Sequence, residues 1–317
     1  MTNGIPGRDS LSKNERREAA RDKAKTLRDQ QRKKDKRSRL LIQGGVLVVL
    51  VAIVATIAVV LTMTINRPET AGPRNMASDG ILIGENYVAM PTAAIQPGSL
   101  PKPNVRDETS DVISIQLYID YFCPICGAFE EANGDQLDTW VETGAATVEI
   151  FPYAILDSRS QGTKYSTRAA NAAACVADQS PDAYYAFHEA LFDARPDEDT
   201  PGLSDEELIT LTKSADVKNA SSIAKCITDQ KFKAWVAEAR DRHRTGPIPN
   251  ADIPIIKGTP TAIVNGVAYT GPLNDQEAFA AFVLQMANSS YNDNSTSSPT
   301  PSPVPTPGTT PSVKPRD

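Results

Sequence analysis

The segment Asp120–Cys126, with the sequence DYFCPIC, places two cysteines at CxxC spacing directly after a segment with a strong strand pattern. Residues Val112–Ile119 (VISIQLYI) alternate between apolar and polar positions and are rich in β-branched side chains, which predicts a strand. From Cys123 to about Val141 the apolar residues recur at helical spacing. The CxxC motif therefore lies where a predicted strand passes into a predicted helix.

The beginning of a helix favours an ionised thiol. Its first backbone N–H groups have no partner inside the helix and the macrodipole favours an anion, so we expect a stabilised, exposed thiolate at Cys123. Pro124 falls near the first helical position, where proline is tolerated. Cys126 lies one turn further along on the apolar face, and we expect it to be buried and protonated. This asymmetry is what thiol–disulfide exchange needs.

A CxxC pair is also half of a common zinc site, but the rest of such a site is missing from this sequence. The other two cysteines, Cys175 and Cys226, stand 51 residues apart, and neither has a nearby cysteine or histidine. The chain has only two histidines, His188 and His243, both in amphipathic helical context. We expect both to be surface or boundary residues, and we expect neither a metal nor another cofactor.

The remaining pattern is that of an α/β domain. Strands are predicted at 147–151, 261–264 and 267–270, and the last two are joined by Asn265-Gly266, which suits a tight hairpin turn. The chain is predicted to be mostly helical from about Lys164 to Arg244, and a final helix is predicted at 275–287.

A second motif, Gly258-Thr259-Pro260-Thr261, precedes the predicted hairpin. Proline cannot donate to a sheet, so Pro260 is expected at the entry of the strand. The Thr259–Pro260 bond is a candidate cis peptide, and an ordinary trans proline in a loop is the alternative.

Together the two motifs resemble those of the thioredoxin-fold superfamily, and more closely those of the DsbA-like extracytoplasmic oxidoreductases. The resemblance covers about residues 111–288 and implies a thioredoxin fold with a helical domain inserted at about 160–245. It also implies a cis Pro260 beside the CxxC pair, with the backbone of Thr259 and Pro260 binding substrate as an added strand. The single predicted anchor described below resembles the Gram-positive, especially actinobacterial, form of the family.

The sequence departs from the family pattern in two places. The dipeptide between the cysteines is Pro-Ile, without the histidine of the enterobacterial type, so one source of thiolate stabilisation is absent. Many relatives carry a buried acid six residues before the first cysteine, where this chain has Leu117. Asp120 is a possible substitute as proton carrier; a solvated or capping carboxylate is the alternative. Tyr121 and Phe122 are candidates for an apolar rim that contacts unfolded substrate, although Phe122 equally suits the core.

Cys175 and Cys226 both fall on predicted helices of the insert. Outside the cytoplasm two lone cysteines usually form a disulfide, and we expect a structural bridge between these helices. Two free buried thiols remain the alternative.

The N-terminal part predicts a membrane anchor. Residues 1–39 contain 14 basic and 6 acidic side chains, and residues 40–66 are uncharged and long enough to span a bilayer as a helix. We interpret 1–39 as a cytoplasmic leader and 40–66 as an uncleaved signal anchor that spans the cell membrane once, with the rest of the chain on the extracytoplasmic side. A cleaved signal peptide is the alternative.

Residues 67–110 are rich in proline, glycine and short polar residues and are interpreted as an extracytoplasmic linker, with 80–90 as a candidate edge strand or hairpin. Residues 289–317 form a Pro/Ser/Thr-rich tail that we expect to be disordered. After residue 39 the chain carries 19 basic and 33 acidic side chains, which argues against nucleic acid as a partner.

These observations predict a membrane-anchored oxidase that introduces disulfides into unfolded exported proteins through Cys123 and Cys126. The resemblance implies a quinone-linked membrane reoxidant of the DsbB or VKOR type. The alternatives are a reductase or isomerase fed by a membrane electron donor, and a non-catalytic thioredoxin-fold binding or chaperone module.

Overall fold

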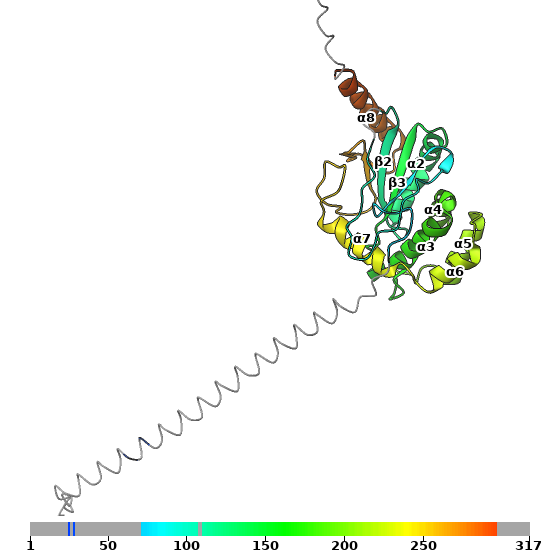
Figure 1. Cartoon of the computed structure of the whole chain (residues 1–317), viewed down its shortest axis with the longest axis vertical. Helices are drawn as coiled ribbons and strands as arrows, with labels where there is room; N and C mark the ends of the chain where they lie inside the picture. The colour runs from blue at the N-terminus through cyan, green and yellow to red at the C-terminus, as the bar shows by residue number, and fades with distance from the viewer. Residues whose placement is uncertain (1–24, 26–27, 29–70, 107–109, 297–317) are drawn as a thin grey trace, which may run out of the picture. The chain divides into compact units, whose positions relative to one another are not determined.

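The computed structural model describes residues 25, 28, 71–106 and 110–296. In this part of the chain, one sheet holds five strands in the order β1-β3-β2-β4-β5 (Figure 1). The strands are β1 (Ile81–Ile83), β2 (Ile113–Ile119), β3 (Ala146–Pro152), β4 (Thr261–Val264) and β5 (Val267–Ala268). β2 and β3 run parallel, whereas all other neighbours are antiparallel. The strand that leads into the CxxC motif is therefore the middle strand of the sheet.

The two faces of the sheet are covered differently because successive strand residues point to opposite sides. Ile115, Leu117 and Ile119 of β2 belong to the main apolar core, which also contains residues of α2 (Pro124–Glu142) and α8 (Gln276–Thr296). Phe129 of α2 and Phe279 of α8 pack edge to face with ring centroids 5.3 Å apart. Tyr118 points to the opposite face, into a smaller cluster with Phe151, Ile248, Ile256 and others.

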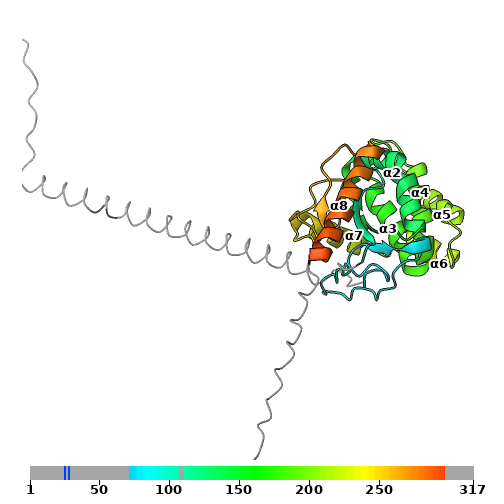
Figure 2. The same cartoon turned by 90° about the horizontal axis from the view of Figure 1, so that it is seen from above.

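Five helices are inserted between β3 and β4: α3 (Tyr165–Gln179), α4 (Tyr184–Asp193), α5 (Asp205–Ser214), α6 (Ala220–Thr228) and α7 (Lys233–Thr245). α3 is buried along almost its whole length and contacts the other four. Its many alanines allow this, because a small side chain lets neighbouring helices approach closely. α4, α5 and α6 lie to one side of the sheet in two views (Figures 1 and 2).

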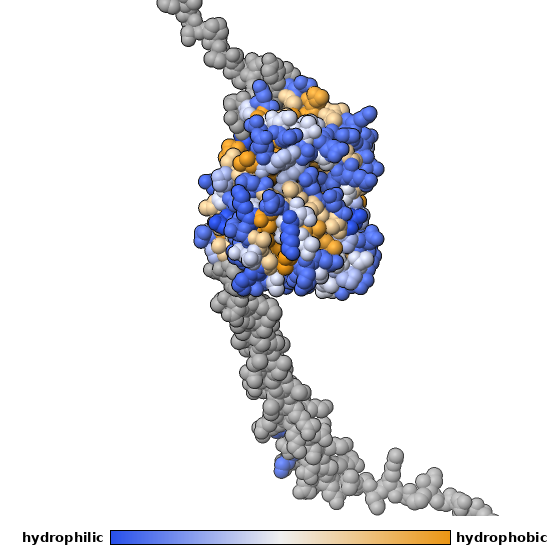
Figure 3. Space-filling model, turned by 90° about the vertical axis from the view of Figure 1, so that its right-hand side faces the viewer, coloured by the Kyte–Doolittle hydropathy of each residue, from blue (hydrophilic) through white to orange (hydrophobic). Residues whose placement is uncertain are grey.

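The face drawn in Figure 3 is mostly hydrophilic, with small separate apolar areas.

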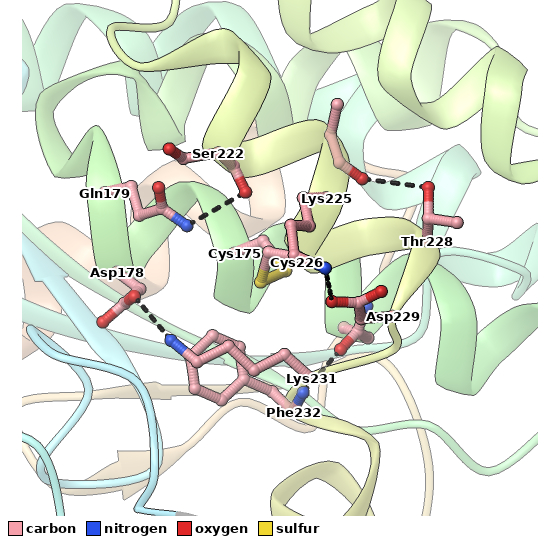
Figure 4. The surroundings of a disulfide bond; sticks show 12 residues. Cys175, Asp178, Gln179, Ser222, Lys225, Cys226, Thr228, Asp229, Lys231 and Phe232 are labelled. Atoms are coloured by element: carbon pink, nitrogen blue, oxygen red, sulfur yellow. Dashed lines mark hydrogen bonds and ion pairs between the residues drawn. A yellow bond between two sulfur atoms is a disulfide. The ribbon is translucent and has the colours of Figure 1, made fainter.

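Cys175 on α3 and Cys226 on α6 form a disulfide, with their Cα atoms 5.9 Å apart (Figure 4). The predicted bridge is thereby confirmed, and both sulfurs belong to the buried core. Polar contacts flank it: Gln179 Nε2 donates to the backbone oxygen of Ser222 at 3.4 Å, and Lys231 pairs with Asp178 at 3.2 Å. The bridge therefore joins two helices of the insert that are far apart in sequence.

The segment predicted as a linker also contributes to the domain. Ile81–Ile83 forms the edge strand β1, which confirms the candidate strand within 80–90, so part of the segment predicted as a spacer belongs to the sheet. Arg242 of α7 donates two hydrogen bonds to the buried carboxylate of Asp79, at 2.6 and 2.7 Å. This pair ties the segment to the helical insert, and composition alone gave no sign of it.

Several predictions about the ends of the chain lie outside the described residues. These are the leader 1–39 (apart from residues 25 and 28), the anchor 40–66 and the tail from residue 297 onward. No helix in the described ranges is long and apolar enough to cross a membrane. α8 continues to Thr296, nine residues beyond the predicted end of the last helix, so the first residues of the predicted tail are helical.

The disulfide gives a prediction for stability. In the loop-entropy model, a bridge that closes a loop of 51 residues stabilises the folded state by about 4 kcal/mol. The double variant Cys175→Ala/Cys226→Ala should lose a free energy of unfolding of this order, measured by chemical denaturation. The matched control is Cys123→Ala/Cys126→Ala, which removes two cysteines but no long loop. Equal losses in the two double variants would contradict the stabilising role.

Candidate functional site

The CxxC pair lies at the beginning of α2, as predicted. Cys123 is the N-cap residue with an extended backbone, and Pro124 occupies the first turn. The N–H of Cys123 donates to the backbone oxygen of Asp120 at 2.9 Å, and the N–H of Gly127 donates to the oxygen of Cys123 at 3.1 Å. These bonds fix the turn that joins β2 to α2, so the first unpaired N–H groups of the helix face the Cys123 sulfur.

The two thiols are in different electrostatic environments. The Cys126 thiol donates to Cys123 Sγ, and with the Thr259 hydroxyl and the N–H groups of Cys126 and Ile125 it lowers the pKa of Cys123 to about 6, against an opposing effect of burial. Burial raises the pKa of Cys126 well above its usual range, and the neighbouring Cys123 raises it further. The predicted asymmetry between a thiolate and a protonated thiol is therefore present.

The exposure of Cys123 differs from the expectation. Only 5% of Cys123 is exposed, against 0% of Cys126, whereas the two residues between them are exposed. Ile125 is an apolar side chain with 55% of its surface in solvent. The backbone oxygen of Thr259 contacts the Cys123 thiol at 3.5 Å and contributes to its burial.

Thr259 and Pro260 lie where the resemblance implied. The Thr259–Pro260 peptide bond is cis, and Pro260 is buried immediately before β4. In its protonated form, Cys123 Sγ donates to the backbone oxygen of Thr259 at 3.5 Å, whereas the Thr259 hydroxyl donates to the thiolate. The sequence pointed to the backbone of Thr259 but not to its hydroxyl group. The Gly246–Pro247 bond is also cis, which no sequence signal indicated.

Asp120 is buried, and three backbone groups donate hydrogen bonds to its carboxylate. It accepts hydrogen bonds from the N–H groups of Phe122, Ile155 and Leu156 at 2.9, 2.8 and 3.0 Å. Burial is the largest effect on this group and raises its pKa to about 6, although the three N–H donors act in the opposite direction. The carboxylate is not solvated and caps no helix, because none of its three donors belongs to α2, so its role as a proton carrier stays a prediction. It joins the CxxC turn to the loop after β3.

The predicted apolar rim at Tyr121 and Phe122 is wrong, because both side chains are buried in the core. The Tyr121 hydroxyl lies 3.2 Å from Tyr184 Oη and 3.2 Å from His188 Nδ1, and His188 Nε2 lies 3.2 Å from Glu130 Oε1. These contacts connect the residue two positions before Cys123 with α4 of the insert. Leu117, at the position where relatives carry an acid, is an ordinary core residue of β2.

The prediction that both histidines lie at the surface or boundary is also wrong. His188 and His243 are 2% and 5% exposed, since each lies on the apolar side of its helix. His243 packs edge to face against Tyr118, and burial lowers its pKa to about 3. It lies on the sheet face opposite α2, away from the CxxC pair.

The chain is similar to several known proteins. A family model described as thioredoxin matches residues 109–283. The serine/threonine-protein kinase PknE of Mycobacterium tuberculosis is 34% identical over 105 residues, which make up 32% of this chain and 19% of the kinase. The chain thus spans about a fifth of the length of the curated relatives it matches first.

Two solved structures from Mycobacterium tuberculosis are similar to the chain. DsbA is 27% identical, with a TM-score of 0.48, and the match covers 68% of this chain and 99% of that one. The disulfide bond oxidoreductase DsbG is also 27% identical with a TM-score of 0.48, over 68% of this chain and 94% of that one. Because the family model covers more than half of the 317 residues, the chain belongs to the thioredoxin family.

Proposed function

We propose that this protein is a membrane-anchored, extracytoplasmic thiol:disulfide oxidoreductase that acts as an oxidase on exported proteins. The observation that carries the proposal is the pair of unequal thiols at the start of α2, with a lowered pKa at Cys123 and a raised pKa at Cys126. A static structural disulfide would not need this difference. The backbone oxygen of Thr259, 3.5 Å from Cys123 Sγ, supports the same interpretation.

The chemistry follows from the two thiols. In the oxidised protein, a substrate thiolate attacks Cys123 Sγ, the Cys123–Cys126 bond breaks, and Cys126 leaves as a thiolate that takes up a proton. A second substrate thiolate then attacks the substrate sulfur of the mixed disulfide, and Cys123 leaves as a thiolate. The substrate loses two electrons and gains a disulfide, while the protein is left as the dithiol.

The direction of electron flow depends on which form of the protein is more stable. Hydrogen bonds from Cys126, Thr259 and the α2 backbone stabilise the Cys123 thiolate, which exists only in the reduced protein. Stabilising the reduced form makes the disulfide a stronger oxidant. This favours the oxidase over the reductase.

The proposed partners follow from this direction. Unfolded exported proteins would add a strand along the backbone of Thr259 and Pro260, where the sulfur of Cys123 is within reach. The resulting dithiol needs an electron acceptor, for which we propose a quinone-linked membrane protein of the DsbB or VKOR type. The Cys175–Cys226 disulfide suits an oxidising compartment.

Membrane anchoring through residues 40–66 completes the proposal. The support is the uncharged length of this segment and the excess of basic residues before it. Alkaline carbonate washing of membranes that contain the full chain tests it, because a spanning protein stays in the membrane pellet. Release into the supernatant, or an N-terminus processed beyond residue 66, would contradict the anchor.

The reduction potential of the Cys123–Cys126 pair tests the oxidase. We expect equilibration with glutathione buffers to give roughly −120 to −180 mV, the oxidising end of the thioredoxin-fold range. The variant Cys123→Ser should show no exchange. A value near roughly −270 mV would contradict the oxidase and favour a reductase. A cysteine pair that does not exchange with glutathione would contradict any redox role and favour the non-catalytic thioredoxin-fold binding or chaperone module.

A further inference from the structure

A surface groove begins beside the CxxC motif and runs between α2 and α4. Pro124 and Gly127 line its end nearest the two thiols, and Arg195 lines it from the chain that follows α4. The other charged residues of the groove are acidic, and they lie further along α2 and on α4: Glu130, Glu131, Asp135, Glu189 and Asp193. Arg195 is therefore the one cation among these lining residues.

The contact between Arg195 and Gly127 places that cation against the first turns of α2. A Cβ atom added to Gly127 would lie 2.6 Å from Arg195 Nε and 3.5 Å from Cζ, so the guanidinium occupies the space that any other residue's side chain would need. Gly127 follows Cys126 directly and is one turn from Cys123, whose oxygen accepts its N–H. Cys123 is the N-cap of α2, so only the first turn of the helix separates it from the residue that the guanidinium contacts.

The position of Arg195 is defined by its own backbone and by a local bond. Its N–H donates to the oxygen of Phe192 at 3.0 Å, in the turn that ends α4, and its Nη1 donates to the oxygen of Pro196 at 3.1 Å. The side chain is half-buried. Among the residues that the structure describes, no carboxylate forms an ion pair with it, so its charge is not neutralised by a direct contact.

We propose that Arg195 is a positioning residue of the site, whose guanidinium stabilises the thiolate of Cys123 across the first turn of α2. The stabilisation of the thiolate by Arg195 does not depend on the proposed function. Only its consequence rests on that function, because a more stable thiolate makes the disulfide a stronger oxidant. The Pro-Ile dipeptide brings no charge to the motif, and here the cation comes from the helical insert instead. The short-range hydrogen bonds described above act on the same sulfur, and the charge adds to them.

Two variants perturb the charge in independent ways. Arg195→Gln removes it. Gly127→Ala keeps it but displaces it, because the new methyl group meets the flexible end of the arginine. Alanine is also the better helix former, so this variant should not lose stability. Arg195→Lys keeps a positive charge at the same place.

The measurement is the pKa of Cys123 in the reduced protein, followed by thiolate absorbance. We expect Arg195→Gln to raise this pKa by about half a unit, or about threefold in the ionisation constant, as the loss of one partly screened unit charge would do. The equilibrium constant with glutathione should change by about the same factor, equivalent to about 15 mV. Gly127→Ala should shift the pKa in the same direction, Arg195→Lys should stay near the parent, and high salt should reduce the differences.

The matched control is Arg240→Gln, which removes the same charge from α7. His243 of this helix packs against Tyr118, on the sheet face opposite α2, so Arg240→Gln should leave the pKa of Cys123 unchanged. Equal shifts in Arg195→Gln and Arg240→Gln, or none in Arg195→Gln, would overturn the proposal. A parent potential in the reductase range would contradict the oxidase alone, because the difference between variants would remain.

Discussion

The antiparallel pairing of β2 with β4 is the constraint on which the site depends. Tyr118 lies opposite Thr261, so the residues that follow β2 meet those that precede β4, although more than a hundred residues separate them in sequence. This register places Cys123 beside Thr259, and the parallel pairing of β2 with β3 places Ile119 opposite Pro152. A slip of one residue in either pairing would turn the core side chains to the wrong face and separate the two motifs.

The helical insert covers part of the sheet and also contacts the turn that carries Cys123. Tyr121, two residues before Cys123, contacts Tyr184 and His188 of α4, and Arg195 reaches Gly127 from the end of the same helix. The insert is stabilised by its own disulfide and by the buried helix α3. These contacts connect the insert directly to the turn that carries the reactive thiol, so the insert belongs to the site.

Much of this could be predicted from the sequence, for physical reasons that differ between elements. The alternation in 112–119 and the helical spacing after Cys123 are local signals, and both elements end within about one residue of their predicted limits. The burial of Tyr121, His188 and His243 could not be predicted, because an aromatic ring or imidazole suits either a boundary or a core, and only tertiary packing decides. The three backbone donors to Asp120 come partly from the loop after β3, and no local pattern reports such a contact. The contact of Arg195 with Gly127 could not be predicted for the same reason.

The unequal pKa values of the two thiols imply that Cys123 is a thiolate at neutral pH while Cys126 stays protonated. The most direct test is a pH titration of the thiolate absorbance of the reduced protein. Because the pKa of Cys123 is lowered, its stabilisation of the reduced form is complete above the ordinary thiol pKa and is lost as the pH falls through about 6. We predict one transition near pH 6 that is absent in Cys123→Ser and moves upward in Cys126→Ala, which removes the main donor to the thiolate. A single transition at the ordinary thiol value of roughly 8.5, unaffected by Cys126→Ala, would show that the Cys123 thiolate is not stabilised.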